Sequence, residues 1–200
     1  MKKIPQLVLA SGSPRRRELL QGLGVEFSVR PADLDESLLP GETPAQHVQR
    51  LAREKAAARA EPGELVLAAD TVVLVDGDIL GKPRDTVEAR AMLERLAGRR
   101  HTVLSGVALI DGDRQRTAHG IARTEVRIAA MTAAEIAWYV DTGEPMDKAG
   151  AYAIQGLGAI FVDAVEGNYT NVVGLPIPLT QSLFRELGFE LRQSCRPRED

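Results

Sequence analysis

Three arginines follow a helix-capping serine close to the start of the chain. Ser13 and Pro14 are typical of the first positions of a helix, and Arg15, Arg16 and Arg17 then fill its first turn. A helix N-terminus carries about half a positive charge, so an exposed cation there costs about 0.3–1 kcal/mol. An anion that binds both the backbone amides and the guanidiniums would offset that cost. The segment 11–16, which begins with Ser11, therefore predicts an oxyanion site suited to a phosphate chain; the alternative is a solvated basic turn.

A single aspartate interrupts an apolar run. Every residue of the run 65–75 is apolar except Asp70 and Thr71. A buried carboxylate without a partner costs several kcal/mol, so it must be neutralised, paired or bound to a metal. Strand ends in α/β sheets are also where ligands bind. Asp70 is therefore a candidate functional carboxylate, and the alternative is a turn or capping aspartate between two strands.

A lysine lies on the apolar stripe of the helix that should precede this run. Val48, Leu51, Ala52 and Lys55 follow helical spacing on one face, so the Lys55 ammonium belongs to the face that packs inward. The alternative is that this side chain extends to solvent along its own aliphatic stem.

Two loops carry further candidates. Asp33, Asp35 and Glu36 have the spacing to offer one or two oxygens to a hard divalent cation, although acidic loops usually bind nothing. The segment 77–82 resembles the end of a P-loop, but only three residues separate its glycines and Pro83 replaces the magnesium-binding hydroxyl, so a P-loop is excluded.

The segment 147–158 places Lys148, Tyr152 and Gln155 among small residues. Such a composition suits close approach of the backbone to a ligand, or tight packing. No histidine or serine hydrolase motif is present, and the three histidines stand singly. The remaining inventory of basic groups, and of carboxylates able to hold magnesium, favours phosphoryl or nucleotidyl transfer to water. A phosphate-monoester hydrolase is weaker, because no DxDxT nucleophile motif occurs.

Strand and helix patterns alternate along the chain, which predicts an α/β fold. Asp-Gly pairs at 76–77 and 111–112 predict hairpins, so the sheet must be mixed. We expect strands over 7–10, 25–29, 65–75, 102–110 and 117–128, and helices over 14–22, 44–60 and 178–187, with two more starting after Asp85 and Thr132. Residues 1–189 should form one domain of two lobes and 190–200 a flexible tail.

The composition sets the outer limits of function. The 200 residues are 44% hydrophobic and 26% charged with a net charge of −3, which describes a globular chain and excludes a fibrous or disordered one. Cys195 is the only cysteine, so no internal disulfide can form, and we expect it to be a surface thiol. No apolar run is long enough to cross a bilayer, so we expect a cytoplasmic protein without a membrane partner. The acidic balance argues against binding a nucleic-acid polymer.

Six ordered motifs resemble one known family. They are Ser11-Gly-Ser-Pro-Arg-Arg16, Ala52-Arg-Glu-Lys55-Ala, Ala69-Asp-Thr-Val-Val73, Gly81-Lys-Pro83, Lys148-Ala-Gly-Ala-Tyr152 with Ile154-Gln-Gly156, and the segment 166–176. Together they resemble the Maf, or septum formation, proteins over nearly the whole chain. The resemblance implies a nucleoside triphosphate pyrophosphatase that cleaves between the α- and β-phosphates with a divalent metal, Mg²⁺ or Mn²⁺. It also implies a mixed sheet flanked by helices, similar to inosine triphosphate pyrophosphatases, a site in a cleft between two lobes, and often a homodimer.

The resemblance also assigns roles to residues. Asp70 would accept a proton from water or hold the metal with Glu36, and Lys55 and Lys82 would neutralise developing charge. Ser11, Arg15, Arg16 and Lys148 would bind the substrate. Arg15, Thr71 and Gln155 match the positions of the branch that acts on dTTP, UTP and related modified pyrimidine nucleotides. Asn168 departs from the family, which more often has Ser there. Such an enzyme would remove non-standard nucleotides and could be linked to cell-division arrest; the alternative is a nucleotide-binding division regulator with little turnover.

Overall fold

The computed structural model describes residues 5–196, which fold into two compact units. Unit 1 contains residues 5–70, 105–122 and 174–196, and unit 2 contains residues 71–104 and 123–173. The strands are β1 (Gln6–Leu9), β2 (Ser28–Val29), β3 (Glu64–Val75), β4 (Asp78–Leu80), β5 (Arg100–Asp111), β6 (Arg116–Ile128) and β7 (Val162–Glu166). The helices are α1 (Pro14–Gly22), α2 (Pro44–Ala57), α3 (Thr86–Leu96), α4 (Ala133–Asp141), α5 (Tyr169–Val173) and α6 (Ile177–Glu186). Residues 5–196 also contain the 3₁₀ helices η1 (Glu144–Asp147), η2 (Ala149–Ala151), η3 (Gly156–Phe161) and η4 (Leu191–Gln193).

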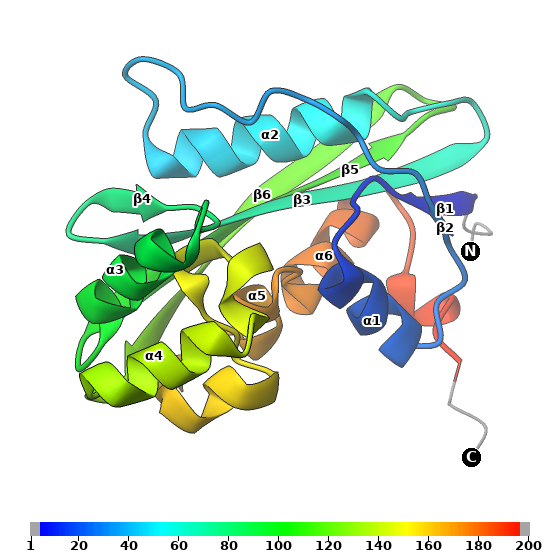
Figure 1. Ribbon diagram of the computed structural model, residues 1–200. Coiled ribbons are helices and arrows are strands. Elements are labelled where there is room, and N and C mark those ends of the chain that lie inside the picture. The colour runs from blue at the N-terminus through cyan, green and yellow to red at the C-terminus, as the bar shows by residue number, and fades with distance from the viewer. Residues whose placement is uncertain (1–4, 197–200) are drawn as a thin grey trace. The chain divides into compact units, whose positions relative to one another are not determined.

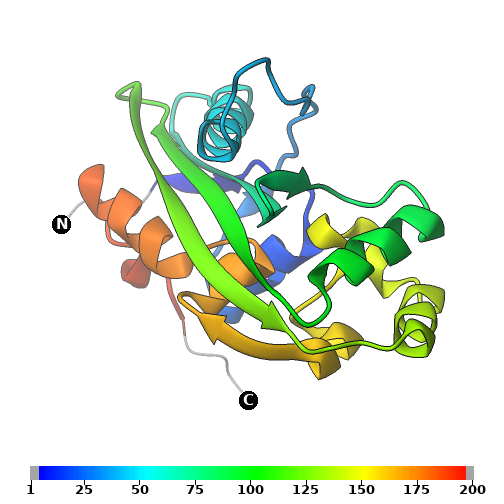
Figure 2. The same ribbon diagram turned by 90° about the vertical axis from the view of Figure 1, so that its left-hand side faces the viewer.

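The sheet is mixed, as the Asp-Gly pairs predict. Its order is β2-β1-β3-β5-β6-β7, and β4 pairs with β3 outside this path. β1 runs parallel to β2 and β3, whereas β4 is antiparallel to β3 and β7 to β6. Figure 2 shows the long hairpin of β5 and β6, closed by the turn after Asp111. At the other predicted hairpin Asp76 and Gly77 both have positive φ, 54° and 87°, as a two-residue hairpin turn requires.

In unit 1 the alternation of side chains along the strands creates two apolar layers. Leu65 and Leu67 on β3 lie in a core cluster with residues of α1 and α6, whereas Val66 and Ala68 lie in a second cluster with Ala52 of α2. Figure 1 shows α2 on one side of β1 and β3 and the helices α1 and α6 on the other. Because side chains alternate between the faces of a strand, Asp70 belongs to the face that α2 covers.

A glycine allows α2 to lie close to the sheet. A Cβ atom at Gly106 of β5 would stand 2.2 Å from the carbonyl oxygen of Val48, so a side chain there would push the helix away. The helix starts as predicted: the Thr43 hydroxyl accepts the Gln46 N–H, and the Gln46 side chain accepts the Thr43 N–H. It ends at Ala57, before the expected residue 60.

Unit 2 has its own core. The apolar residues that build it come from the ends of β3, β5 and β6 together with β4, α3, α4 and the 3₁₀ segments. Asp85 caps α3 through the Glu88 N–H, and Thr132 and Glu135 form the predicted capping box of α4. Strand β7 and helix α5, in contrast, were not predicted, because each is short and carries no strong local signal.

Three expectations about unit 1 are wrong. The strand expected over 25–29 is reduced to Ser28–Val29, because Gly24, with φ 66°, and Val25 close the end of α1: the Val25 N–H bonds to the Leu20 carbonyl oxygen. The tail expected from residue 190 begins instead with η4, whose Leu191 is buried in the core. Cys195 is half-buried against this core and is not the expected surface thiol. Residues 197–200 of the tail lie outside the described residues.

Candidate active site

The candidate carboxylate Asp70 forms a buried ion pair. Lys55 Nζ donates to Asp70 Oδ1 at 2.7 Å and contacts Glu36 Oε1, also at 2.7 Å. The Lys55 and Asp70 side chains are 8% and 10% exposed, whereas that of Glu36 is 57% exposed. Asp70 lies within the continuous strand β3, so it is not a turn aspartate, and Lys55 does not extend to solvent. Unit 1 thus joins a half-exposed carboxylate and a buried carboxylate through one ammonium group.

The register of the strands sets Ser11 beside this cluster. β1 and β3 pair in parallel up to Leu9 and Leu67, and the ladder continues with the Ala10 N–H, which bonds to the Leu67 carbonyl oxygen at 2.8 Å. Ser11 therefore follows the carboxyl end of β1 at the level where β3 approaches Asp70. Carboxyl ends of neighbouring parallel strands are where α/β sheets bind ligands.

The predicted oxyanion segment is preorganised by Ser11 and Arg16. The Ser11 hydroxyl oxygen accepts the Arg16 Nη1–H at 2.9 Å and the Ser13 N–H at 3.3 Å, and Arg16 Nε donates to the Gly174 carbonyl oxygen at 2.8 Å. Ser13, in contrast, is the N-cap residue of α1, but its hydroxyl makes no capping hydrogen bond within residues 5–196. Arg17 is exposed. The fold therefore anchors the Arg16 guanidinium at two points.

The charges of this segment and of the carboxylates act on one another. Burial lowers the pKa of Arg16; Asp70 opposes that shift, Arg15 adds to it and Glu36 opposes it. An arginine remains protonated despite such a shift. Arg16 is therefore attracted by the charges of Asp70 and Glu36 and repelled by that of Arg15. An anion bound beside Arg15 and Arg16 would reduce the repulsion between the two guanidiniums.

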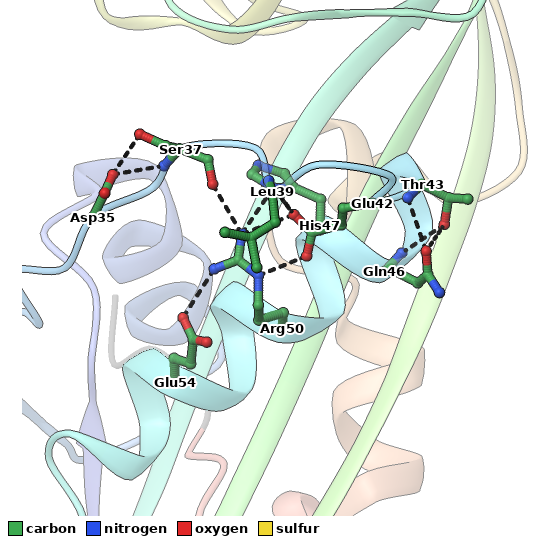
Figure 3. A network of polar contacts seen from close by, with 9 residues as sticks. All are labelled: Asp35, Ser37, Leu39, Glu42, Thr43, Gln46, His47, Arg50 and Glu54. Carbon is green, nitrogen blue, oxygen red and sulfur yellow. Dashed lines mark hydrogen bonds and ion pairs between the residues drawn. The ribbon is translucent and has the colours of Figure 1, made fainter.

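The loop that carries Glu36 is tied to α2 at several points (Figure 3). Arg50 donates through Nη2 to the Ser37 carbonyl oxygen at 3.0 Å, and through Nε and Nη2 to the two Glu42 carboxylate oxygens at 2.6 and 2.9 Å. The Arg50 guanidinium lowers the pKa of Glu42 to about 2. Arg59, just beyond the end of α2, donates to the Pro31 carbonyl oxygen at 2.8 Å. Contacts on both sides of Glu36 therefore hold the loop against the helix that carries Lys55.

The acidic loop itself provides little free ligand capacity. Asp35 Oδ1 accepts the N–H and the hydroxyl of Ser37 at 2.9 and 2.5 Å, so this carboxylate shapes the turn. Between residues 5 and 196, no three His, Cys, Asp or Glu side chains gather as a metal site would require. Glu36 and Asp70 remain as a pair of carboxylates that share Lys55.

The other predicted site residues belong to unit 2, where two of their motifs meet. The Gly150 N–H donates to the Gly81 carbonyl oxygen at 3.0 Å, which joins the segments of Lys148 and Lys82. Gly150 has φ 70°, and a Cβ atom there would lie 3.0 Å from the Val73 side chain on β3. Lys148 Nζ donates to the Glu144 carbonyl oxygen at 2.7 Å and to Asp147 Oδ1 at 2.5 Å, whereas Lys82 is exposed.

Thr71 directly follows Asp70 and is half-buried, as is Gln155. The Gln155 amide forms no hydrogen bond with the rest of the described chain. Residues on both sides of Gln155 are hydrogen-bonded to Tyr139 and Glu144. The sequence did not predict a role for either of these two residues. The only local signal was the glycine spacing of Gln155-Gly156-Leu157-Gly158.

Asn168, the departure from the family motif, has a local structural role. Its Oδ1 accepts the Asn171 N–H at 2.8 Å and the Thr170 hydroxyl at 2.6 Å, so it caps α5. Serine and asparagine are both good N-cap residues, so Asn can replace the Ser that is more common there.

Comparison with known proteins identifies the family. The family model described as Maf-like protein matches residues 6–187. The dTTP/UTP pyrophosphatase of Anaeromyxobacter dehalogenans is 57% identical over 94% of this chain and 96% of its own. Those of Symbiobacterium thermophilum and Myxococcus xanthus are 50% and 52% identical, over 93% and 92% of this chain and 96% and 94% of theirs. Among solved structures, the Staphylococcus aureus Ham1 protein gives a TM-score of 0.46 at 14% identity, covering 95% of this chain and 93% of its own.

No helix in the described range 5–196 has the length and apolar character needed to span a membrane.

The family model covers most of the chain, and the relatives are at least half identical over more than nine-tenths of it. The protein belongs to the Maf-like family.

Proposed function

We propose that this protein is a pyrophosphatase for dTTP and UTP that releases the nucleoside monophosphate and pyrophosphate. The observation that carries the proposal is the buried Asp70–Lys55 pair, with Glu36 at its exposed side and the Ser11–Arg16 contact at the neighbouring strand end. This arrangement supplies a proton acceptor and an anion site within one unit. The names of the relatives at 50–57% identity supply the substrate class.

In the proposed reaction water attacks the α-phosphorus, and the bond from that phosphorus to the oxygen bridging to the β-phosphate breaks. Pyrophosphate leaves with the bridging oxygen, and the proton of the attacking water passes to Asp70. Asp70 Oδ1 is engaged by Lys55, so Oδ2 is the oxygen that would accept this proton. Lys55 holds the orientation of the carboxylate and offsets its charge as the phosphates approach.

A divalent cation fits this carboxylate pair only together with the substrate. Mg²⁺ usually binds through one or two carboxylates plus phosphate oxygens and waters, not in an all-protein cage. Glu36 and Asp70 each keep one oxygen that does not contact Lys55, which matches that requirement. We therefore propose that Glu36 and Asp70 would hold a metal, Mg²⁺ or Mn²⁺. Asp70 Oδ2 would then either accept the proton of water directly or serve as a ligand of the metal that carries the water. When bound, such an ion polarises a phosphoryl oxygen or activates water.

The remaining assignments rest on the family resemblance and extend the proposal. Ser11, Arg15 and Arg16 would bind the triphosphate, with Lys148 as a further substrate contact. Lys82 would neutralise charge on the leaving pyrophosphate.

Thr71, Gln155 and Arg15 would set the preference for pyrimidines. The Gln155 amide is suited to this task, because it can donate to a carbonyl and accept from the ring N–H of uracil or thymine.

The biological setting is also proposed. We place the protein in the cytoplasm, as a homodimer that removes non-standard nucleotides and is linked to cell-division arrest. Size-exclusion chromatography with light scattering tests the dimer.

The proposal is tested by incubating UTP or dTTP with magnesium and measuring pyrophosphate and monophosphate. We expect Asp70→Asn to reduce turnover by about 10²- to 10⁴-fold, the usual contribution of a general base. Asp163→Asn is the matched control, since Asp163 forms an exposed ion pair with Arg127. Inorganic phosphate without pyrophosphate, or an unimpaired Asp70→Asn, would contradict the proposal. Tight binding of the triphosphate with negligible turnover would instead support a division regulator.

A further inference from the structure

Two side chains of unit 2 hold the turn that contains Gln155. Glu144 Oε1 accepts the Tyr139 hydroxyl and the Gly158 N–H, both at 2.8 Å, and Glu144 Oε2 accepts the Leu157 N–H at 2.9 Å. The Tyr139 hydroxyl oxygen in turn accepts the Ala153 N–H at 3.0 Å. Backbone groups on both sides of Gln155 are therefore bonded to one hydrogen-bonded pair of side chains, which we call the Tyr139–Glu144 clamp.

Two glycines of the turn are required by this clamp. Gly156 has φ 71°, and a Cβ atom there would stand 2.4 Å from Glu144 Oε2. A Cβ atom at Gly158 would stand 2.4 Å from the Tyr139 hydroxyl oxygen. Side chains at either position would push the turn off the clamp, which accounts for the spacing Gly-Leu-Gly directly after Gln155.

The clamp is built for rigidity. Tyr139 is fully buried, and its ring packs against Phe161 with centroids 5.7 Å apart. Burial raises the pKa of Tyr139, so the hydroxyl keeps the proton that it donates. Burial also raises the pKa of Glu144, but the hydrogen bonds from Leu157, Gly158 and Tyr139 and the charge of Lys148 together hold that pKa below its usual value. Hydrogen bonds to a charged acceptor are stronger than neutral ones, so the turn has a firm anchor.

A fixed backbone matters because the amide of Gln155 has two chemically different ends. Uracil and thymine present a ring N–H between two carbonyls, whereas cytosine presents a ring nitrogen acceptor beside an amino group. Turning an amide by half a rotation exchanges its donor and its acceptor, so a loosely held glutamine could satisfy either base. A held peptide fixes the point from which the Gln155 side chain extends, and so it limits which edge of a base the amide can reach.

We propose that Tyr139 and Glu144 are positioning residues that fix the backbone from which Gln155 extends and thereby support the preference for uracil and thymine over cytosine. This inference rests on the proposed function. Neither residue contacts the base; both act through the backbone of the turn.

The experiment compares kcat and KM for UTP, dTTP and CTP in the wild type and in Glu144→Gln and Tyr139→Phe. Glu144→Gln preserves shape but turns an amide N–H₂ toward a backbone N–H. We expect the ratio of kcat/KM for UTP to that for CTP to fall about tenfold, equivalent to one lost hydrogen bond. The change should lie mainly in KM. Tyr139→Phe should lower the ratio by a smaller factor, and inhibition by pyrophosphate, which has no base, should be unchanged in both.

Glu135→Gln is the matched control. Glu135 also accepts two hydrogen bonds, from the N–H and hydroxyl of Thr132 at 2.7 and 2.8 Å, but it caps the start of α4 away from the turn. It should lower stability without changing the UTP to CTP ratio. Should Glu144→Gln fail to fold by circular dichroism, Tyr139→Phe decides the matter. An unchanged ratio in the folded variants overturns the positioning role, whereas a wild type that makes no pyrophosphate overturns the proposed function itself.

Discussion

The buried pair of Lys55 and Asp70 makes a prediction that does not depend on activity. Lys55→Met removes the ammonium and leaves the Asp70 carboxylate, 10% exposed, without its partner. Removing one member of a buried ion pair costs about 3–5 kcal/mol of unfolding free energy, because a charge remains in a poorly solvated place. Asp70→Asn alone should cost less, about 1–3 kcal/mol, since Lys55 keeps Glu36 as a partner and the amide oxygen still accepts a hydrogen bond.

The double variant Lys55→Met with Asp70→Asn should be less destabilised than the two single losses added together. Both buried charges are then absent, and Glu36, whose side chain is 57% exposed, remains solvated. We expect a coupling of about 2–3 kcal/mol between the two positions. Urea unfolding of the four proteins at neutral pH, followed by circular dichroism, measures it.

An exposed pair provides the control for this cycle. Arg127 Nη2 lies 2.6 Å from Asp163 Oδ2, and the two side chains are 47% and 46% exposed. Exposed pairs of this kind couple by at most about 1 kcal/mol, because water screens both charges. A Lys55–Asp70 coupling no larger than that of Arg127–Asp163 would refute the reasoning that burial makes this cluster strongly interdependent.

Two further predictions concern a helix cap and a buried histidine. Thr43→Ala should lower the free energy of unfolding by about 0.5–2 kcal/mol, because Thr43 caps α2. Ser13 also stands directly before a helix-starting proline, but its hydroxyl makes no capping hydrogen bond within residues 5–196, so Ser13→Ala should lower the free energy of unfolding far less. Equal losses of unfolding free energy for the two variants in urea would contradict this. Burial lowers the pKa of His101 to about 4. The unfolded chain then binds a proton that the folded chain rejects, so stability is lost as pH falls from about 6.5 to 4. His101→Gln should remove about 3 kcal/mol of that loss, and a urea midpoint with the same pH dependence as the wild type would disprove the assignment.

Much of the secondary structure could be predicted from short segments. The capping box of Thr43 and Gln46 and the Asp-Gly turn after β3 occur as expected, because each depends on residues within four positions of one another. The prediction of a strand at Val25 is wrong. Its apolar neighbours favour a strand, but the Val25 N–H bonds to the Leu20 carbonyl oxygen at the end of α1 and is not free to pair with a strand. Strand β7 and helix α5 are too short for their pattern to stand out.

The residues of the candidate site could be predicted from the sequence, but the contacts between them could not. An aspartate in an apolar run and a lysine on an apolar helical face each signal a residue that needs a partner, and both are visible without coordinates. That Asp70 and Lys55 are partners depends on the register of β3, which puts Asp70 on the face covered by α2. The contact of Ser11 with Arg16 likewise depends on how α1 leaves the end of β1.

The sequence by itself determined most of the order of elements, the mixed sheet and the buried charged residues that need a partner. These features follow from local hydrogen bonding and from the alternation of apolar side chains. Only the tertiary structure decided which charges neutralise one another and how the turn of Gln155 is held. The Tyr139–Glu144 clamp joins residues up to 14 positions apart through a buried hydroxyl and a carboxylate. Such contacts arise from packing in three dimensions, and no local pattern specifies them.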